Sequence, residues 1–266
     1  MTLPLTYTLV RHGYSEANAI QAGRKSQSIT SLPENFFLRH DSKMRLTPRG
    51  VEQAQAAGEW IKKNGLVFDR FYSSPHVRAV ESASHLKLGG QWILDDRFRE
   101  RDYGEIHSAS KDFKDPNSDA SLHSKKLSRW YWKPQGGESL ATGVRLRVES
   151  IMNTFHRREG IRHTIAVTHG EFIDVSQFVL ERLTPELWGL KHDDEKYKVQ
   201  NCMVVQYSRV NPENPEDIRR NFNWKRGICP WDESLSWDGG QWINIGIVKY
   251  SDDELTQYVE SHERLF

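Results

Sequence analysis

The stretch Y-T-L-V-R-H-G at residues 7–13 decides the fold. Its first four residues form an apolar run that predicts a short buried strand, and the strand ends at the tripeptide R-H-G. Two later segments repeat this arrangement. A predicted strand at 68–72 leads into S-S-P, and a predicted buried strand at 164–167 leads into T-H-G. Because parallel strands end at one edge of a sheet, we expect these three turns to meet there.

Helices are expected between these strands. Thr47-Pro48 has the N-cap and first-turn proline of a helix start, and helical spacing continues to about Lys63. Ser74-Pro75 repeats the same signal for the next helix. Residues 21–47 are polar and irregular, which predicts a long loop. The other expected helices span 138–155, 172–183 and a last segment opened by a capping box at Ser251, and the other expected strands span 92–94, 202–207 and 242–248.

Strands alternate with helices through most of the chain. This alternation predicts an α/β fold, a three-layer sandwich with a mostly parallel central sheet, in a single domain over residues 1–266. Two segments depart from the alternation. We interpret residues 105–135 as an insertion over the C-terminal ends of the strands and residues 208–266 as a C-terminal extension. The insertion contains W-Y-W at 130–132, which we expect to pack it onto the core, with stacking on a sugar or base as the alternative.

Composition excludes several classes of protein. The 266 residues carry 37 basic and 36 acidic side chains, and this balance gives no reason to expect a nucleic-acid or membrane partner. No targeting signal or membrane span is apparent. The two cysteines, Cys202 and Cys229, cannot form a disulfide framework and are expected to be reduced thiols. We therefore expect a cytoplasmic protein that acts on a small molecule, and self-association into a homo-oligomer stays open.

Two histidines and two arginines are expected to share the C-terminal edge of the sheet. Together Arg11, His12, Arg78 and His169 would form a small cationic pocket. A phosphate dianion suits such a pocket, because arginine offers paired donors and histidine a further one. A divalent metal does not suit it, since guanidinium groups repel a cation and no carboxylate cluster is apparent. A neutral imidazole in the pocket can itself attack phosphorus.

Each of these residues also has an ordinary explanation when it is taken singly. A histidine after a strand is usually a hydrogen-bonded loop residue, and Arg78 on a helix is usually a solvated charge. Glu100 lies in the charge-rich segment 97–102, which by default is a solvated loop. Glu138, in the turn G-G-E-S, could simply complement the dipole of the helix that follows. Only the joint placement of these residues points to a phosphate site.

Six ordered motifs carry a resemblance to a known family. They are L-V-R-H-G-Y-S-E-A-N, L-T-P-R-G-V-E-Q-A-Q-A-A-G, Y-S-S-P-H-V-R-A-V-E-S-A, R-E-R-D-Y-G, W-K-P-Q-G-G-E-S-L and A-V-T-H-G-E-F. Over about residues 5–207 the chain resembles the histidine phosphatase superfamily, which contains cofactor-dependent phosphoglycerate mutases and many acid-type phosphatases. Residues 208–266 match no pattern of that family beyond one late strand.

The resemblance implies a role for each matching residue. His12 would be the nucleophile that forms a phosphohistidine, and Glu100 would protonate the leaving oxygen and later activate water. Asn18 would hydrogen-bond the phosphoryl group. Three side chains would hold the phosphoryl oxygens and stabilise the charge during transfer: Arg11, Arg78 and His169. Two positions near the pocket would have supporting roles in substrate binding: Ser15 and Glu138.

The resemblance leaves three functions open. The leading hypothesis is a metal-independent phosphatase that needs no cofactor and hydrolyses a small phosphomonoester. A phosphoglycerate-mutase-type isomerase is the alternative, but residues 19–46 lack the Gly-Trp pair and residues 105–135 the adjacent arginines that are typical of mutases. A non-catalytic phospho-ligand binder is the third, and it would be marked by loss of a histidine or of the acid. None of these is lost here.

Overall fold

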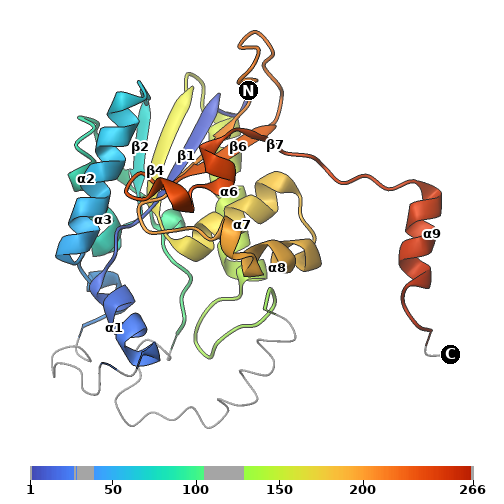
Figure 1. The fold of residues 1–266 in the computed structure, drawn as a ribbon, viewed down its shortest axis with the longest axis horizontal. Helices are drawn as coiled ribbons and strands as arrows, with labels where there is room; N and C mark the ends of the chain where they lie inside the picture. The colour runs from blue at the N-terminus through green and yellow to red at the C-terminus, as the bar shows by residue number, and fades with distance from the viewer. Residues whose placement is uncertain (1, 27, 29–38, 105–128, 265–266) are drawn as a thin grey trace.

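The computed structural model describes residues 2–26, 28, 39–104 and 129–264. Its centre is a seven-stranded sheet with the strand order β3-β2-β4-β1-β5-β6-β7 (Figure 1). The strands are β1 Thr6–Arg11, β2 Arg70–Ser73, β3 Trp92–Leu94, β4 His163–Thr168, β5 Val204–Ser208, β6 Trp224–Ile228 and β7 Ile243–Asn244. Their side chains face two apolar layers, so the sheet is the middle of the fold.

The sheet is mixed rather than parallel throughout. Strands β3, β2, β4 and β1 pair in parallel, with Arg11 opposite Thr168 at the end of the β1–β4 ladder. Beyond β1, the pairs β1–β5, β5–β6 and β6–β7 are all antiparallel. The predicted α/β fold is confirmed, and the prediction of a mostly parallel sheet is confirmed only for the half that carries the three motif turns.

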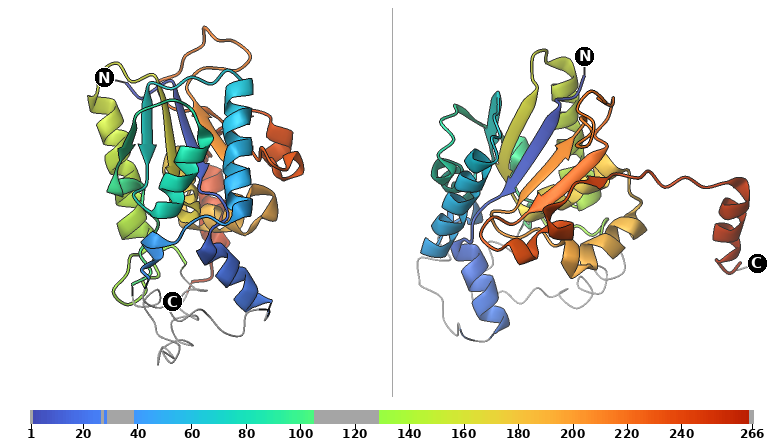
Figure 2. Two further views of the ribbon diagram at one scale, coloured as in Figure 1. Left: turned by 90° about the vertical axis from the view of Figure 1, so that its left-hand side faces the viewer. Right: turned by 45° about the horizontal axis from the view of Figure 1, so that its top comes forward.

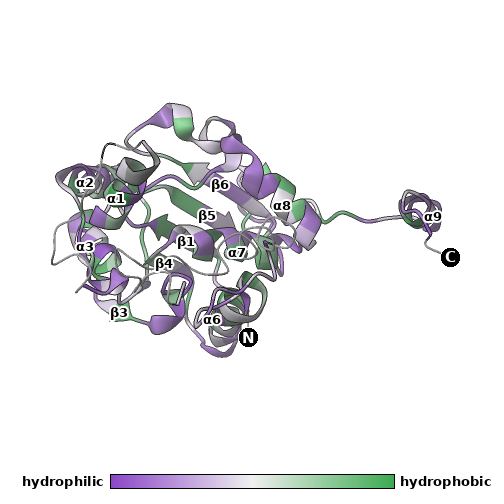
Figure 3. Cartoon of the chain, turned by 90° about the horizontal axis from the view of Figure 1, so that it is seen from below, coloured by the Kyte–Doolittle hydropathy of each residue, from purple (hydrophilic) through white to green (hydrophobic). Residues whose placement is uncertain are grey.

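Helices cover both faces of the sheet (Figures 1 and 2). Side chains alternate along β1, so Tyr7 and Leu9 join the cluster that includes Phe155, whereas Val10 joins the opposite cluster with Ile61. Figure 3 shows the hydrophobic strands between helices of mixed hydropathy. The helices are α1 Glu16–Lys25, α2 Pro48–Lys63, α3 Val77–Leu86, α6 Arg145–Arg157, α7 Gly170–Glu181, α8 Pro185–Asp193 and α9 Asp252–Glu260.

The two Ser/Thr-Pro signals have different outcomes. Thr47 caps α2 as predicted, since its side chain accepts a hydrogen bond from the backbone N–H of Gly50. The predicted start at Ser74-Pro75 is wrong by two residues, because α3 begins at Val77 with no side-chain cap. The Ser74 hydroxyl lies instead 2.8 Å from Nε2 of His169. Ser74, which has the sequence signature of a helix cap, therefore contacts His169 and does not cap α3.

Two helices were not predicted. The expected loop at 21–47 is wrong at its start, because α1 extends to Lys25. Helix α8 was missed although Thr184-Pro185 has the same cap-and-proline signal as α2, and the Thr184 side chain does cap it. Both helices lie beside the site described below.

The C-terminal extension belongs to the sheet. Strand β6 was not predicted, because W-K-R-G-I places charges in a buried strand, and the predicted strand at 242–248 is reduced to Ile243–Asn244. The capping box of α9 is confirmed at Ser251. This helix stands away from the other elements (Figure 1). None of the helices in the described ranges is long and apolar enough to cross a membrane.

Most of the predicted insertion, residues 105–128, lies outside the described residues. The described remainder supports packing on the core rather than a free aromatic platform. Trp130 is buried and stacks on Phe178 of α7 with ring centroids 3.8 Å apart, and Trp132 is also buried. Tyr131 between them is exposed. The packing prediction is confirmed for the two tryptophans.

Candidate active site

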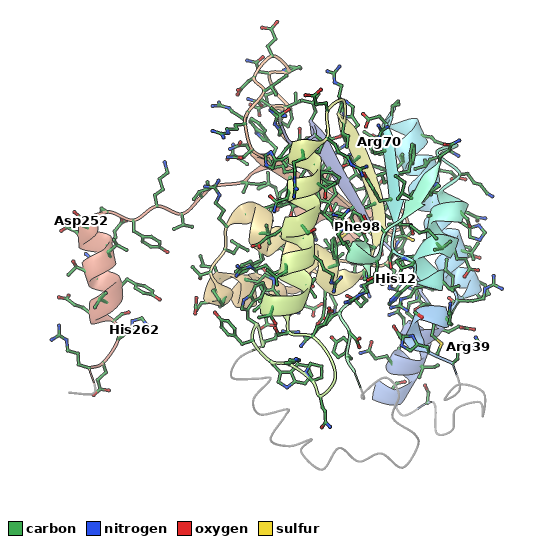
Figure 4. The ribbon with its side chains drawn as sticks, turned by 180° about the vertical axis from the view of Figure 1, so that it is seen from behind. His12, Arg39, Arg70, Phe98, Asp252 and His262 are labelled. Atoms are coloured by element: carbon green, nitrogen blue, oxygen red, sulfur yellow. The ribbon has the colours of Figure 1, made fainter. Side chains whose placement is uncertain are left out.

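His12 follows directly after β1, at the C-terminal end of the parallel strands. Its backbone N–H donates to the carbonyl oxygen of Thr168 at 2.9 Å, which joins the first and third motif turns. Figure 4 shows His12 at one end of the sheet and Arg70, the first residue of β2, at the other. The expected meeting of the motif turns at one sheet edge is confirmed.

The hydrogen bonds of His12 define its protonation state. Its Nδ1 lies 2.8 Å from the carbonyl oxygen of Gly13, which can only accept, so Nδ1 carries the proton. The Nε of Arg78 donates to His12 Nε2 at 3.3 Å, which requires a lone pair on Nε2. Burial, followed by the charges of Arg78 and Arg11, holds the pKa of His12 well below its usual value. The imidazole is therefore neutral and nucleophilic at Nε2.

Two guanidinium groups flank this imidazole. Arg78 is buried and held by Asp41, with Nη2 to Oδ2 at 2.9 Å and Nη1 to the carbonyl oxygen at 2.8 Å. Arg11 donates from Nη1 to the Val199 carbonyl at 2.6 Å, while its buried Nε has no hydrogen-bond partner within the described part of the chain. An arginine with an unused buried donor is ready for an oxyanion.

Three imidazoles gather in the pocket. The rings of His12 and His169 have centroids 5.1 Å apart, and those of His169 and His76 are 4.8 Å apart. The Nδ1 of His169 is buried without a partner among the described residues. Burial and Arg78 lower the pKa of His76 to about 4. Sequence reasoning missed Ser74 and His76 as site residues, although the S-S-P turn that contains Ser74 was recognised as unusual.

Glu100 provides a carboxyl group that is still about half protonated at neutral pH. Burial is the largest cause, and the charge of Glu171 adds to it, so that the pKa of Glu100 rises to about 7 against the opposing effect of Arg78. The backbone N–H of Arg101 donates to its Oε1 at 3.0 Å. A carboxylic acid with this pKa matches the requirement for a general acid at physiological pH.

A cavity of about 420 Å³ adjoins Arg11 and Glu100. One wall is formed by α7, and the other walls are formed by α8, by the short helix η5 (Glu195–Tyr197) and by Arg129. Of the catalytic candidates, Arg11 and Glu100 line this cavity. Its position and size fit the non-phosphoryl part of a small substrate.

Asn18 and Ser15 form a small network beneath His12. Asn18 Oδ1 accepts from the Ser15 hydroxyl at 3.0 Å and from Asn201 Nδ2 at 3.3 Å. Asn201 also donates to the backbone carbonyl of His12 at 2.9 Å. The network orients the amide of Asn18, so that a role in binding a phosphoryl oxygen falls to its Nδ2 donor. Asn201 was not predicted, because only the fold brings it next to His12.

Glu138 forms an ion-pair cluster with Arg99, which lies next to Glu100 in the chain, and with Arg147. It binds Arg99 through both oxygens, at 2.8 and 2.5 Å, and Arg147 at 2.9 Å, and it accepts from the backbone N–H of Asp102. Burial alone would raise its pKa, but the two arginines outweigh this effect and lower the pKa to about 2. The predicted supporting role becomes a positioning role for residues 99–102.

We expect Glu138→Gln to reduce the free energy of unfolding by about 2–3 kcal/mol at pH 7. A carboxyl group with a pKa of about 2 in the folded state and an ordinary pKa when unfolded stabilises the fold above the unfolded value. This stabilisation of the fold is lost as the pH falls through about 2, the pKa of Glu138 in the folded state. Urea unfolding at several pH values would measure it, and the difference between variant and parent should narrow from pH 4.5 downwards. A difference in the free energy of unfolding that stayed constant with pH would contradict an ionic role for Glu138.

The cluster of residues around His12 is cationic and contains no metal-ligand set. Within residues 2–26, 28, 39–104 and 129–264, no group of three or more histidine, cysteine, aspartate or glutamate side chains could hold a metal ion. Arg11 and Arg78 instead place two guanidinium groups beside the imidazole of His12. The arrangement suits an oxyanion with two negative charges.

Comparisons with known proteins agree with this geometry. A 2,3-bisphosphoglycerate-dependent phosphoglycerate mutase of Brucella melitensis biotype 2 is 31% identical over 194 residues, 68% of this chain and 84% of that protein. A protein of the same description from Azorhizobium caulinodans is 31% identical over 191 residues, 67% of this chain and 82% of its own length.

Solved structures share the fold at lower identity. The alpha-ribazole phosphatase of Shigella flexneri matches with a TM-score of 0.58 at 18% identity, covering 82% of this chain and 96% of that one. Mycobacterial glucosyl-3-phosphoglycerate phosphatase matches with a TM-score of 0.56 at 22% identity, covering 80% and 93%. The family model of the histidine phosphatase superfamily (branch 1) matches residues 7–205. The chain belongs to the histidine phosphatase superfamily.

Proposed function

We propose that the protein is a metal-independent phosphatase that hydrolyses a small phosphomonoester through a phosphohistidine on His12. One observation carries the proposal. The contact between Nδ1 of His12 and the Gly13 carbonyl leaves the lone pair of the ring on Nε2, where Arg78 donates to it. Glu100, a carboxylic acid with a pKa of about 7, lies at the same pocket. These groups support the proposal because they suit the roles of nucleophile, oxyanion donor and general acid.

The reaction would proceed in two balanced steps. In the first, Nε2 of His12 forms a bond to phosphorus while the bond to the leaving oxygen breaks, and Glu100 gives its proton to that oxygen. Arg11, Arg78 and His169 stabilise the charge on the phosphoryl oxygens during transfer. In the second step, Glu100 takes a proton from water and the water oxygen bonds to phosphorus while the bond from phosphorus to Nε2 breaks, which returns the lone pair to neutral His12 and releases phosphate.

Two features favour hydrolysis over a mutase reaction. The segment at 105–135 has no adjacent arginine pair that could hold the second phosphate of a bisphosphate. In addition, Glu171 and Asp174 line the cavity close to Arg11 and add negative charge where a second phosphate would lie. The mutases among the relatives keep the isomerase as the alternative. A pure binding protein would not need the protonated acid at Glu100.

We expect inorganic phosphate to be released from simple phosphomonoesters in the presence of EDTA and without any bisphosphate primer. The cationic pocket supplies the charge that a metal would otherwise supply, and vanadate should inhibit because it mimics the transferring phosphoryl group. A phosphate-release assay on a panel of phosphorylated metabolites measures this. Interconversion of 3- and 2-phosphoglycerate that outpaces phosphate release would favour the mutase, and activity that is lost with EDTA would contradict the metal-independent mechanism.

A further inference from the structure

One face of α7 presents acceptor oxygens to the cavity beside the phosphoryl pocket. Glu171, Asp174 and Gln177 follow at intervals of three residues, which places them along one side of the helix, and all three line the cavity. We propose that this acceptor stripe binds a protonated amine on the substrate, so that the substrate is a short amino-alkyl phosphomonoester. The inference rests on the proposed phosphatase function and specifies its substrate class.

Two oxygens of the acceptor stripe are buried and unused. Gln177 is 4% exposed, and its Oε1 has no hydrogen-bond partner among the described residues. The Oε2 atom of Glu171 is also buried and has no hydrogen-bond partner among the described residues. A buried acceptor without a partner is costly, by about 1–3 kcal/mol, and a ligand that donates to it removes that cost. An ammonium group has three N–H donors and no acceptor, which complements such a stripe.

The charge of the stripe favours an ammonium group over a neutral hydroxyl. Asp174 Oδ2 lies 3.2 Å from Nδ1 of His192, and Asp174 and Glu171 together bring two carboxylates to this face of α7. Arg101 Nη1 lies 3.6 Å from Glu171 Oε1, which is longer than a hydrogen bond, and the neutral hydroxyl of Tyr103 hydrogen-bonds Glu171 without cancelling its charge. Negative charge therefore remains on this wall of the cavity.

The cations of the other walls already have carboxylate partners. Lys198 lies 3.0 Å from Glu195, and Arg129 lies 2.8 Å from Asp193. Lys191 lies 2.5 Å from the carboxylate of Glu181, which it shares with Lys225. These pairs hold the cations in place. Among the described residues that line this cavity, the buried groups without a partner are the Arg11 Nε donor at the phosphoryl pocket and the acceptors on α7, which a donor-rich ligand would satisfy.

The acceptor stripe begins at the phosphoryl pocket. A side-chain carbon added at Gly170 would lie 3.4 Å from Nε of Arg11, so the first turn of α7 packs directly against that guanidinium. From Glu171 to Gln177 the helix advances by about 9 Å. A substrate with its phosphate on Arg11 and its amine on the stripe would therefore have a short chain between the two groups.

The test compares two substrates that differ in one group. Ethanolamine phosphate carries an ammonium group where 2-hydroxyethyl phosphate carries a hydroxyl, and the two are otherwise matched in length. We expect the parent enzyme to prefer the amine by about tenfold or more in kcat/KM. Asp174→Asn and, separately, Gln177→Leu should each reduce this preference severalfold. The control Glu149→Gln removes a charge from a residue of α6 that is paired with Arg145 and does not line the cavity, and it should leave the preference intact.

The preference is a ratio within one enzyme preparation, so partial misfolding of a variant does not affect it. Equal kcat/KM values for the two substrates, or a preference that Asp174→Asn leaves intact, would overturn the amine site. Turnover of p-nitrophenyl phosphate by the parent separates that result from a failure of the proposed function. If the parent hydrolyses no phosphomonoester at all, the phosphatase proposal itself is wrong.

Discussion

Replacing His12 with alanine is expected to reduce phosphate release by roughly 10⁴–10⁶, because the residue that bonds to phosphorus is lost. The imidazole is the nucleophile in the proposed reaction, and its Nε2 lone pair is directed by Gly13 and Arg78. Rapid acid-free quenching of the parent enzyme with labelled substrate should trap acid-labile phosphate on His12. The variant should trap none.

The fold should survive this substitution. Arg78 keeps both of its bonds to Asp41 when His12 is absent, so no charge is left without a partner. Thermal unfolding of the variant would establish this. His262→Ala is a matched control, since His262 lies beyond α9, far from His12 in Figure 4, and its loss should leave turnover unchanged. Near-parent activity of His12→Ala, with the fold intact, would exclude the phosphohistidine mechanism.

The central site could be predicted because its residues directly follow strands of the sheet or lie on the first turn of the helix after one. His12 and His169 both come directly after a strand, and parallel strands deliver their C-terminal residues to one edge whatever the loops do. Arg78 enters on the first turn of α3, the helix that follows β2. Only strand recognition and the order of the motifs were needed. The α/β architecture followed from the same alternation.

Residues whose role depends on tertiary contacts could not be predicted. Ser74 has the sequence signature of a helix cap, and only the neighbouring His169 shows why it does not act as one. Lys225 makes β6 look polar in sequence, yet it is buried because Glu181, which is 44 residues away, neutralises it at 2.6 Å. Periodicity measures apolar burial and therefore misses a buried ion pair.

At the active site, the protonation state of Glu100 likewise depends on tertiary contacts that the sequence does not show. Its sequence context, between two arginines, predicts a solvated and ionised carboxylate. In the fold, burial and the nearby carboxylate of Glu171 have the opposite effect and raise its pKa to about 7. Because a general acid must hold its proton, kcat/KM for a substrate with a basic leaving group should fall as the pH rises above this value.

Glu100→Gln is therefore expected to act selectively on the leaving group. An alkoxide that leaves from an alkyl phosphate is strongly basic and needs a proton, so phosphohistidine formation from such a substrate should slow by roughly 10²–10⁴. A nitrophenolate is a weak base and needs little help, so formation from p-nitrophenyl phosphate should slow much less. The decline of alkyl phosphate turnover above pH 7 should also disappear in the variant.

The measurement must isolate the first chemical step. In the proposed mechanism Glu100 also activates water in the second step, so its loss would limit steady turnover of both substrates alike, and only the burst phase reports on leaving-group protonation. Glu16→Gln is a suitable control, because Glu16 binds Arg39 and the backbone of Arg45 at the start of α1. Equal burst losses for the two substrates would mean that Glu100 only positions the phosphate. No loss with either would transfer the acid role to another carboxylate, such as Glu171, which also lines the cavity.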